Sequence, residues 1–165
     1  MRRVMTLGLM ALALLLAVGV SDQVAFATKA PAFKKSPTFT VSELQLSASG
    51  TISGLNASTE YPDDTTVFLV AYGSLTVDCF DQFGTLLGDA TAPFYGLRGE
   101  QLIPDSQIRS NTQFSLTTPA PSLTPEQAGC PAGATSSTAV DVTYWSASVG
   151  VIQGGYIIVG RFYYL

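Results

Sequence analysis

The sequence predicts an all-β protein: an antiparallel β-sandwich of the immunoglobulin-like or Greek-key type, with about seven to eight strands and one disulfide. Three observations support this class. Apolar and polar residues alternate over several segments, apolar residues nowhere recur at helical spacing for more than a turn or two, and turn-forming residues separate the segments. A partly closed barrel is the alternative arrangement.

The strongest strand signal covers residues 65–79, where the apolar residues share one parity with Cys79. Phe68, Val70 and Tyr72 occupy the opposite parity. This segment is therefore expected to be a central strand, covered on both faces at one end.

Other segments give weaker strand signals. Residues 38–49 alternate with a phase that shifts once near Ser42, as a β-bulge would cause. Further strands are expected over residues 101–103, 112–118, 139–149 and 156–165, with a tight turn at residues 153–155. The last strand is rich in aromatic residues. We expect it to pair within its own sheet, and pairing with another chain is the alternative.

The N-terminal segment is typical of an export signal. Two arginines precede an apolar run over residues 4–20, and residues 25–27 supply the small-residue pattern that signal peptidase recognises. Cleavage is expected after Ala27, with Ala30 as the second choice. An uncleaved anchor would need roughly 20 apolar residues, so we predict a secreted protein with no membrane attachment after cleavage.

The remaining chain is expected to form one domain over residues 38–165, because its length suits a single core. Residues 28–37 precede this domain and contain two prolines and three lysines without periodicity. They are predicted to be a flexible lead-in.

Cys79 and Cys130 are the only two cysteines. An oxidising compartment would join them, and the bridge would close a loop of about 50 residues, worth about 4 kcal/mol in the chain-entropy model. A redox or metal-binding pair is the alternative, but no C-x-x-C spacing and no histidine supports it. We predict a structural disulfide and neither a metal site nor a cofactor.

Composition excludes several function classes. The absence of histidine removes catalysis that relies on imidazole, and eight basic against twelve acidic residues argue against nucleic-acid binding. Carboxylates are the remaining candidates for catalysis, and Asp78, Asp81 and Asp89 lie close together in the sequence. A pair of them could hydrolyse a glycoside if the carboxyl groups lay about 5–10 Å apart in a cleft. Turn or solvating roles are the commoner use of such residues, so no catalytic residue is assigned.

Residues 80–100 are the most unusual stretch, because they are expected to form a loop and yet are strongly apolar. Such a loop either packs as a lid over one end of the core or offers a binding surface. The candidate anchors of that surface are Phe83, Phe94, Tyr95 and Arg98, residue types that interfaces favour.

Six segments resemble a group of secreted bacterial two-cysteine β-sandwich proteins of uncharacterised function. The segments are GTISGL at residues 50–55, TTVFLVAYGSLTVDC at 65–79, IPDSQIRSN at 103–111, FSLTTPAP at 114–121, GCP at 129–131 and SASVGVIQGG at 146–155. The resemblance implies a secreted sandwich with a Cys79–Cys130 bridge and implies no activity. The group has an Asn-, Gly- and Pro-rich segment after its first cysteine, whereas this chain has the apolar residues 80–99.

These observations predict a secreted, non-enzymatic module that acts at or outside the cell surface. Its partner would be a surface protein, a glycan or a second copy of itself. The alternatives are a small carbohydrate-active hydrolase that uses paired carboxylates, and a protease inhibitor that presents the loop at residues 80–100.

Overall fold

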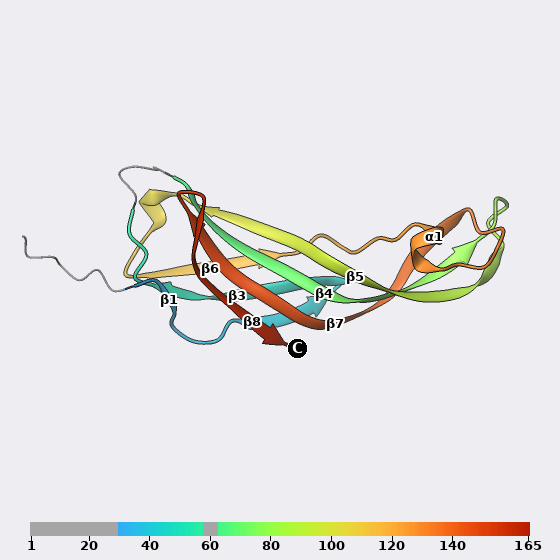
Figure 1. The fold of residues 1–165 in the computed structure, drawn as a ribbon, viewed down its shortest axis with the longest axis horizontal. Coiled ribbons are helices and arrows are strands. Elements are labelled where there is room, and N and C mark those ends of the chain that lie inside the picture. The colour runs from blue at the N-terminus through green and yellow to red at the C-terminus, as the bar shows by residue number, and fades with distance from the viewer. Residues whose placement is uncertain (1–29, 58–62) are drawn as a thin grey trace, which may run out of the picture.

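The computed structural model describes residues 30–57 and 63–165, so the predicted signal sequence lies outside the described residues. Two antiparallel sheets pack face to face and confirm the predicted sandwich (Figure 1). Sheet A contains β1 (Ala32–Phe33), β2 (Thr38–Ser42), β3 (Gln45–Ser53) and β6 (Asn111–Thr117). Sheet B contains β4 (Thr65–Phe80), β5 (Leu86–Ile103), β7 (Ser136–Gln153) and β8 (Tyr156–Tyr164). The short helices are η1 (Asp105–Gln107) and α1 (Pro125–Ala128).

Sheet A is built around β3, which pairs with β6 on one side and with β2 and β1 on the other. The predicted bulge near Ser42 is wrong, because β2 and β3 form a hairpin. Its turn residues Glu43 and Leu44 have positive φ angles of 50° and 66°. A two-residue turn and a bulge both shift the phase of an alternating pattern, so the pattern alone did not distinguish them.

The lead-in predicted to be flexible is partly folded. Phe33 in β1 lies opposite Ile52 of β3 and is only 5% exposed. Its ring packs edge to face against Phe114, with the ring centroids 6.0 Å apart. One buried aromatic side chain therefore attaches the lead-in to sheet A, an effect that the lysines and prolines around it concealed.

Sheet B has the order β5-β4-β7-β8, and β4, β5 and β7 run almost the whole length of the molecule (Figure 1). Both neighbours of β4 have a bulge next to Tyr72. On β5, Tyr95 and Gly96 together lie opposite Tyr72. On β7, Trp145 is an extra residue between the partners of Tyr72 and Gly73. Such bulges bend a sheet. Sheet A covers sheet B only on the N-terminal side of this bend in β4. We call the part beyond it, formed by residues 73–80, 86–94 and 136–144, the extension.

A connection over residues 118–135 covers the inner face of the extension. Within it, Thr124 caps α1, because its hydroxyl accepts a hydrogen bond from Gln127 N and the Gln127 side chain accepts one from Thr124 N. The buried Ala128 of α1 packs on the core. The Cys79–Cys130 disulfide, with a Cα–Cα distance of 5.8 Å, joins this connection to β4 and confirms the predicted bridge.

The loop predicted over residues 80–100 is wrong, because only residues 81–85 lie between strands: Phe80 ends β4, and residues 86–100 belong to β5. Ala90, Ala92 and Phe94 alternate toward the inner face in register with β4. Four glycines in the segment suggested a loop, but one of them, Gly96 with φ of 71°, serves the two-residue bulge beside Tyr72.

One continuous core fills the space between the sheets and extends under the connection. Its fully buried large side chains include Leu46, Ile52, Val67, Leu69, Leu75, Val77, Ile103, Val149 and Val151. At the bend, the Tyr144 hydroxyl donates a 2.8 Å hydrogen bond to the Leu44 carbonyl and ties sheet B to the β2–β3 turn. Burial raises the pKa of this hydroxyl.

Candidate functional site

Of the four residues predicted to form a binding surface, Phe94 and Tyr95 line one shallow depression of about 430 Å³, whereas Phe83 and Arg98 do not border it. Phe83 is 82% exposed in the turn at the tip of the extension. Phe94 is buried, packing edge to face against Tyr144 at a centroid distance of 5.6 Å, so it belongs to the core. Tyr95 is exposed in the β5 bulge, and Arg98 lies over the ring of Phe68. Strand parity directs Phe94 inward, so it serves mainly the core, and its use as a surface anchor stays a prediction.

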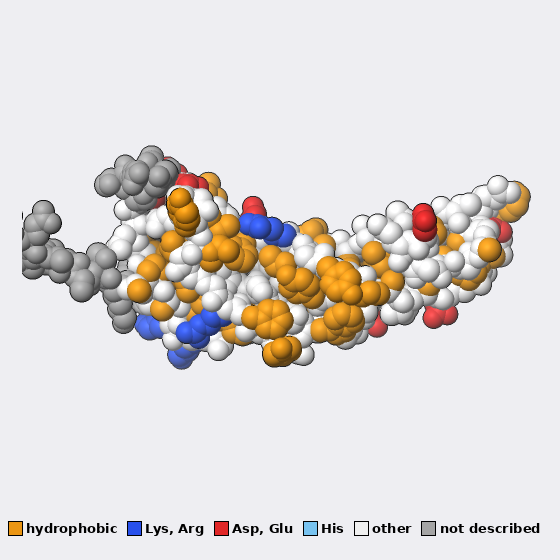
Figure 2. All heavy atoms as spheres, in the orientation of Figure 1, with side chains coloured by type: hydrophobic (Ala, Val, Ile, Leu, Met, Phe, Trp, Pro, Cys, Tyr) orange, Lys and Arg blue, Asp and Glu red, His pale blue; other side chains and the backbone are white. Residues whose placement is uncertain are grey.

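A more coherent surface lies on the outer face of sheet B, opposite the core. Register places Tyr72 beside Ser146 and Tyr164, Val70 beside Ser148 and Phe162, and Phe68 beside Gly150 and Gly160. Aromatic and aliphatic side chains of β4 and β8 thus flank a row of small residues on β7. We call these nine residues the aromatic face. Figure 2 shows hydrophobic side chains gathered over the region where β7 and β8 run in Figure 1.

The small residues on β7 allow the neighbouring aromatic rings to pack close to the sheet, so that the aromatic face is flat. A Cβ on Gly150 would collide with the ring of Phe68, so this ring lies across the backbone of β7. On β8, the rings of Phe162 and Tyr164 pack edge to face with centroids 5.1 Å apart. Beside them is a shallow depression of about 250 Å³, lined by Phe68, Ser148, Val149, Ile157, Gly160, Arg161 and Phe162.

Charge on the aromatic face is low. The Arg98 guanidinium lies 5.2 Å from the centroid of the Phe68 ring and forms an ion pair with Glu100. Arg161 contributes one further cation at the rim of the depression. Apolar rings, serine hydroxyls and a self-neutralised ion pair suit a ligand that is polar but carries little charge.

The carboxylates singled out in the sequence lie on the extension. Asp78 of β4 stands directly opposite Asp89 of β5 in the register, on the outer face of the sheet. Neither residue lines any of the depressions that we identify among the described residues. Nor do His, Cys, Asp and Glu residues in the described ranges 30–57 and 63–165 form a group that could hold a metal ion.

Asp81 has a structural role in the turn at the tip. Its Oδ1 accepts 2.8 Å hydrogen bonds from both Phe83 N and Thr85 N. The bond from Thr85 is the largest effect that lowers the pKa of this carboxyl below its ordinary value of 3.8. A carboxylate committed to two backbone donors is an Asx-turn residue, and its lowered pKa opposes the role of a general acid.

The two hydrogen bonds to Asp81 predict a pH-dependent turn. The charged form is favoured in the folded turn, so this stabilisation is complete above pH 3.8 and is lost as the pH falls through the lower folded pKa. The amide NMR resonances of Phe83 and Thr85 should therefore titrate together with a midpoint below 3.8. Asp81→Asn should abolish this titration, and a midpoint above 3.8 would contradict the assignment.

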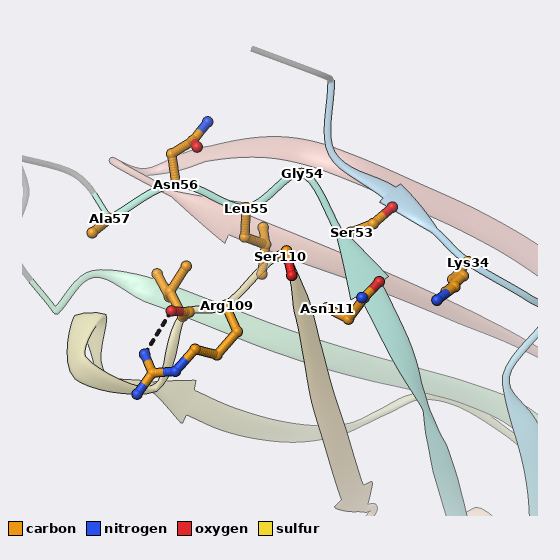
Figure 3. Close-up of a pocket in the computed structure, with 10 residues that line it drawn as sticks. Lys34, Ser53, Gly54, Leu55, Asn56, Ala57, Arg109, Ser110 and Asn111 are labelled. Atoms are coloured by element: carbon orange, nitrogen blue, oxygen red, sulfur yellow. Dashed lines mark hydrogen bonds between the residues drawn. The ribbon is translucent and has the colours of Figure 1, made fainter.

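The largest of the depressions that we identify, about 670 Å³, lies at the end of the sandwich opposite the extension, and Figure 3 shows it in close-up. It is lined by Lys34, Ser53, Gly54, Leu55, Asn56, Ala57, Ile108, Arg109, Ser110 and Asn111. Figure 3 shows the Arg109 guanidinium turned toward the backbone, where it donates a 2.8 Å hydrogen bond to the Ile108 carbonyl. One of the two cations is thus held against its own loop, which leaves Lys34 as the main charge that could meet a ligand.

Comparison with protein-family models, curated proteins and solved structures gave no match. What the fold itself establishes is a disulfide-linked, two-sheet β-sandwich. Among the residues that the structure describes, no helix has the length and apolarity to cross a membrane.

The sequence pattern indicates the residues on each strand of the aromatic face, but it does not indicate that these strands lie side by side. The opposite parity of Phe68, Val70 and Tyr72 and the aromatic character of the last strand are visible in the pattern. The expectation that both faces of β4 are covered at one end holds for Phe68, which is 8% exposed, although the second sheet packs only on the inner face. Only the β4–β7–β8 pairing brings the two sets together, and strand order is not readable from alternation.

Proposed function

We propose that the protein is an exported, non-enzymatic binding module that holds a neutral glycan chain on the aromatic face. The predicted signal at residues 1–27 and the disulfide support export, because disulfides persist mainly in oxidising compartments. The observation that carries the proposal is the aromatic face itself: the exposed rings of Phe162 and Tyr164 on β8 border a row of serine and glycine residues on β7, and the less exposed rings of β4 close its other side.

Each part of this face has a use in binding a sugar. A pyranose ring has an apolar C–H face that packs on aromatic rings, and its hydroxyls need hydrogen-bond partners. The exposed ring of Tyr164 offers stacking area, while Ser148 and the Arg98–Glu100 pair offer donors and acceptors. The open sheet surface accommodates a chain rather than a single sugar, because nothing among the described residues encloses it.

Tyr164→Ala should weaken binding of a neutral oligosaccharide by roughly three- to tenfold, the value of one aromatic contact. Calorimetry with a panel of cello-, chito- and xylo-oligosaccharides would measure the affinity. The matched control is Tyr156→Ala, which removes a comparably exposed tyrosine of the same strand (75% against 88%) at the far end from Tyr164.

The proposal predicts binding by at least one member of the panel, loss in Tyr164→Ala and retention in Tyr156→Ala. Failure of every oligosaccharide to bind, or equal loss in both variants, would contradict it. Chromatography of the sugars after long incubation should show unchanged chain lengths. Shortened chains would instead favour the hydrolase and direct attention to the opposed Asp78 and Asp89.

A further inference from the structure

Strand β8 leaves one edge of sheet B unpaired. In the described part of the chain it pairs only with β7, and its other backbone edge meets no strand. Unpaired N–H and C=O groups along such an edge form a ready template for another strand. The question is whether this edge is protected, as edges of monomeric proteins usually are.

The other edge strands carry more protection than β8 does. β5, at the opposite edge of sheet B, contains Pro93, the two-residue bulge at residues 95–96 and the charged residues Asp89, Arg98 and Glu100. In sheet A, β1 and β2 are only two and five residues long, and the Thr117 carbonyl of β6 lies tightly against Gly99 of β5. Short strands, proline, bulges and charges all discourage edge pairing.

By contrast, β8 reads YIIVGRFYY: nine residues with no proline, no lysine and a single charge. Its one irregularity faces β7 near Ile158. Apart from Arg161, its exposed side chains and that of Leu165 are large and apolar: Tyr156 at 75%, Ile157 at 66%, Phe162 at 53%, Tyr164 at 88% and Leu165 at 47%. β8 therefore has the composition of a strand that is paired on both sides.

We infer that β8 pairs antiparallel with β8 of a second copy, about a two-fold axis near Gly160, to form one continuous eight-stranded sheet. An antiparallel edge is complementary to itself, so a second copy supplies the matching edge without a further requirement. In this register Arg161 faces Val159 of the other copy, which keeps the two arginines from direct opposition. The axis is perpendicular to the sheet, so both aromatic faces lie on one side of the dimer.

The exposed apolar side chains of β8 set an upper limit on the area that edge pairing can bury. With roughly 150–250 Å² of buriable area per aromatic side chain, the exposed parts of Tyr156, Phe162 and Tyr164 amount to about 300–550 Å² per copy. Ile157 and Leu165 add to this strip. Edge pairing covers only the flanks of these side chains and leaves the rings of Phe162 and Tyr164 open on the outer face, so the buried area stays below the roughly 600–800 Å² per partner of standard interfaces and predicts a weak, reversible dimer.

Gly160 provides the sharpest test of the dimer. A side chain at this position fits within a single copy, but in the dimer it would face the same side chain of the second copy. A Cβ at this position would meet only ordinary contacts, at 3.7 Å from Ile157 Cγ2 and 4.0 Å from Val149 O. Gly160→Asp should keep the fold and set two carboxylates opposite each other, which weakens dimerisation by roughly tenfold or more. Gly160→Ala is the matched control, and Leu102→Asp places the same charge at an exposed position of β5.

Sedimentation velocity from micromolar to millimolar protein, without glycan, would measure the dimer, and circular dichroism would verify that each variant is folded. Wild type, Gly160→Ala and Leu102→Asp should dimerise with similar dissociation constants, and Gly160→Asp should stay monomeric over most of the range. As a measurement that needs no variant, amide exchange in β8 should slow with rising concentration while exchange in β4 stays constant. A wild type that is monomeric throughout, or a Gly160→Asp variant that dimerises equally well, would overturn the inference. Neither outcome bears on glycan binding, which is measured separately through Tyr164.

Discussion

Replacing Phe94 with serine should lower the free energy of unfolding by about 3–5 kcal/mol, the cost of removing a buried aromatic side chain. The ring is 7% exposed and packs edge to face against Tyr144, whose hydroxyl ties the two sheets together. The change therefore creates a cavity at the bend, next to the ring of Tyr144. Urea denaturation followed by fluorescence would measure the loss.

The adjacent residue is the natural control. Tyr95 is 73% exposed in the β5 bulge, so Tyr95→Ser should cost about 1 kcal/mol or less. A similar loss in both variants would mean that the whole segment packs as a lid, as one interpretation of the sequence held. A small loss in both would mean that Phe94 faces solvent, contrary to the structure.

Removing the Cys79–Cys130 disulfide should have a comparably large effect. The double variant Cys79→Ala/Cys130→Ala opens a loop with a sequence separation of 51 residues, which the chain-entropy model values at about 4 kcal/mol. The loss should begin at the extension, because Cys130 attaches the connection that covers its inner face. Amides of residues 123–135 should thus exchange faster than those of β3.

Reduction of the wild-type protein provides the matched comparison for the double variant. Both should show the same lowered midpoint in thermal or urea unfolding, since both leave the chain uncrosslinked. Exchange that accelerates uniformly over both sheets would contradict a local attachment. A loss below about 1 kcal/mol would show that the rest of the connection holds without the bridge.

The sequence allowed the two-sheet class, the central strand and the disulfide to be predicted because each depends on local or countable features. The parity of residues 65–79 follows from the two-residue repeat of a strand. The bridge follows from there being only two cysteines, and the last hairpin from Gly154-Gly155, whose φ angles of 58° and 78° suit a tight turn.

The predictions failed for two reasons. Some sequence signals are compatible with two local structures, and some features depend on contacts between residues far apart in the sequence. Gly96 marks a bulge within a strand as readily as a loop, which concealed β5. The phase shift near Ser42 fits a hairpin as well as a bulge. The aromatic face depends on β7 lying between β4 and β8, and pairing between strands far apart in the sequence leaves no trace in alternation.

The continuity of β4, β5 and β7 through the bend also has a mechanical consequence. Strands of 16 to 18 residues extend roughly 50–60 Å, and no loop interrupts them between the sandwich and the tip of the extension. The tip is therefore connected to the sandwich by a stiff sheet rather than by a flexible linker. A force applied along the strands would load the hydrogen bonds between β4 and β7 in shear, all at once, instead of peeling them apart one by one.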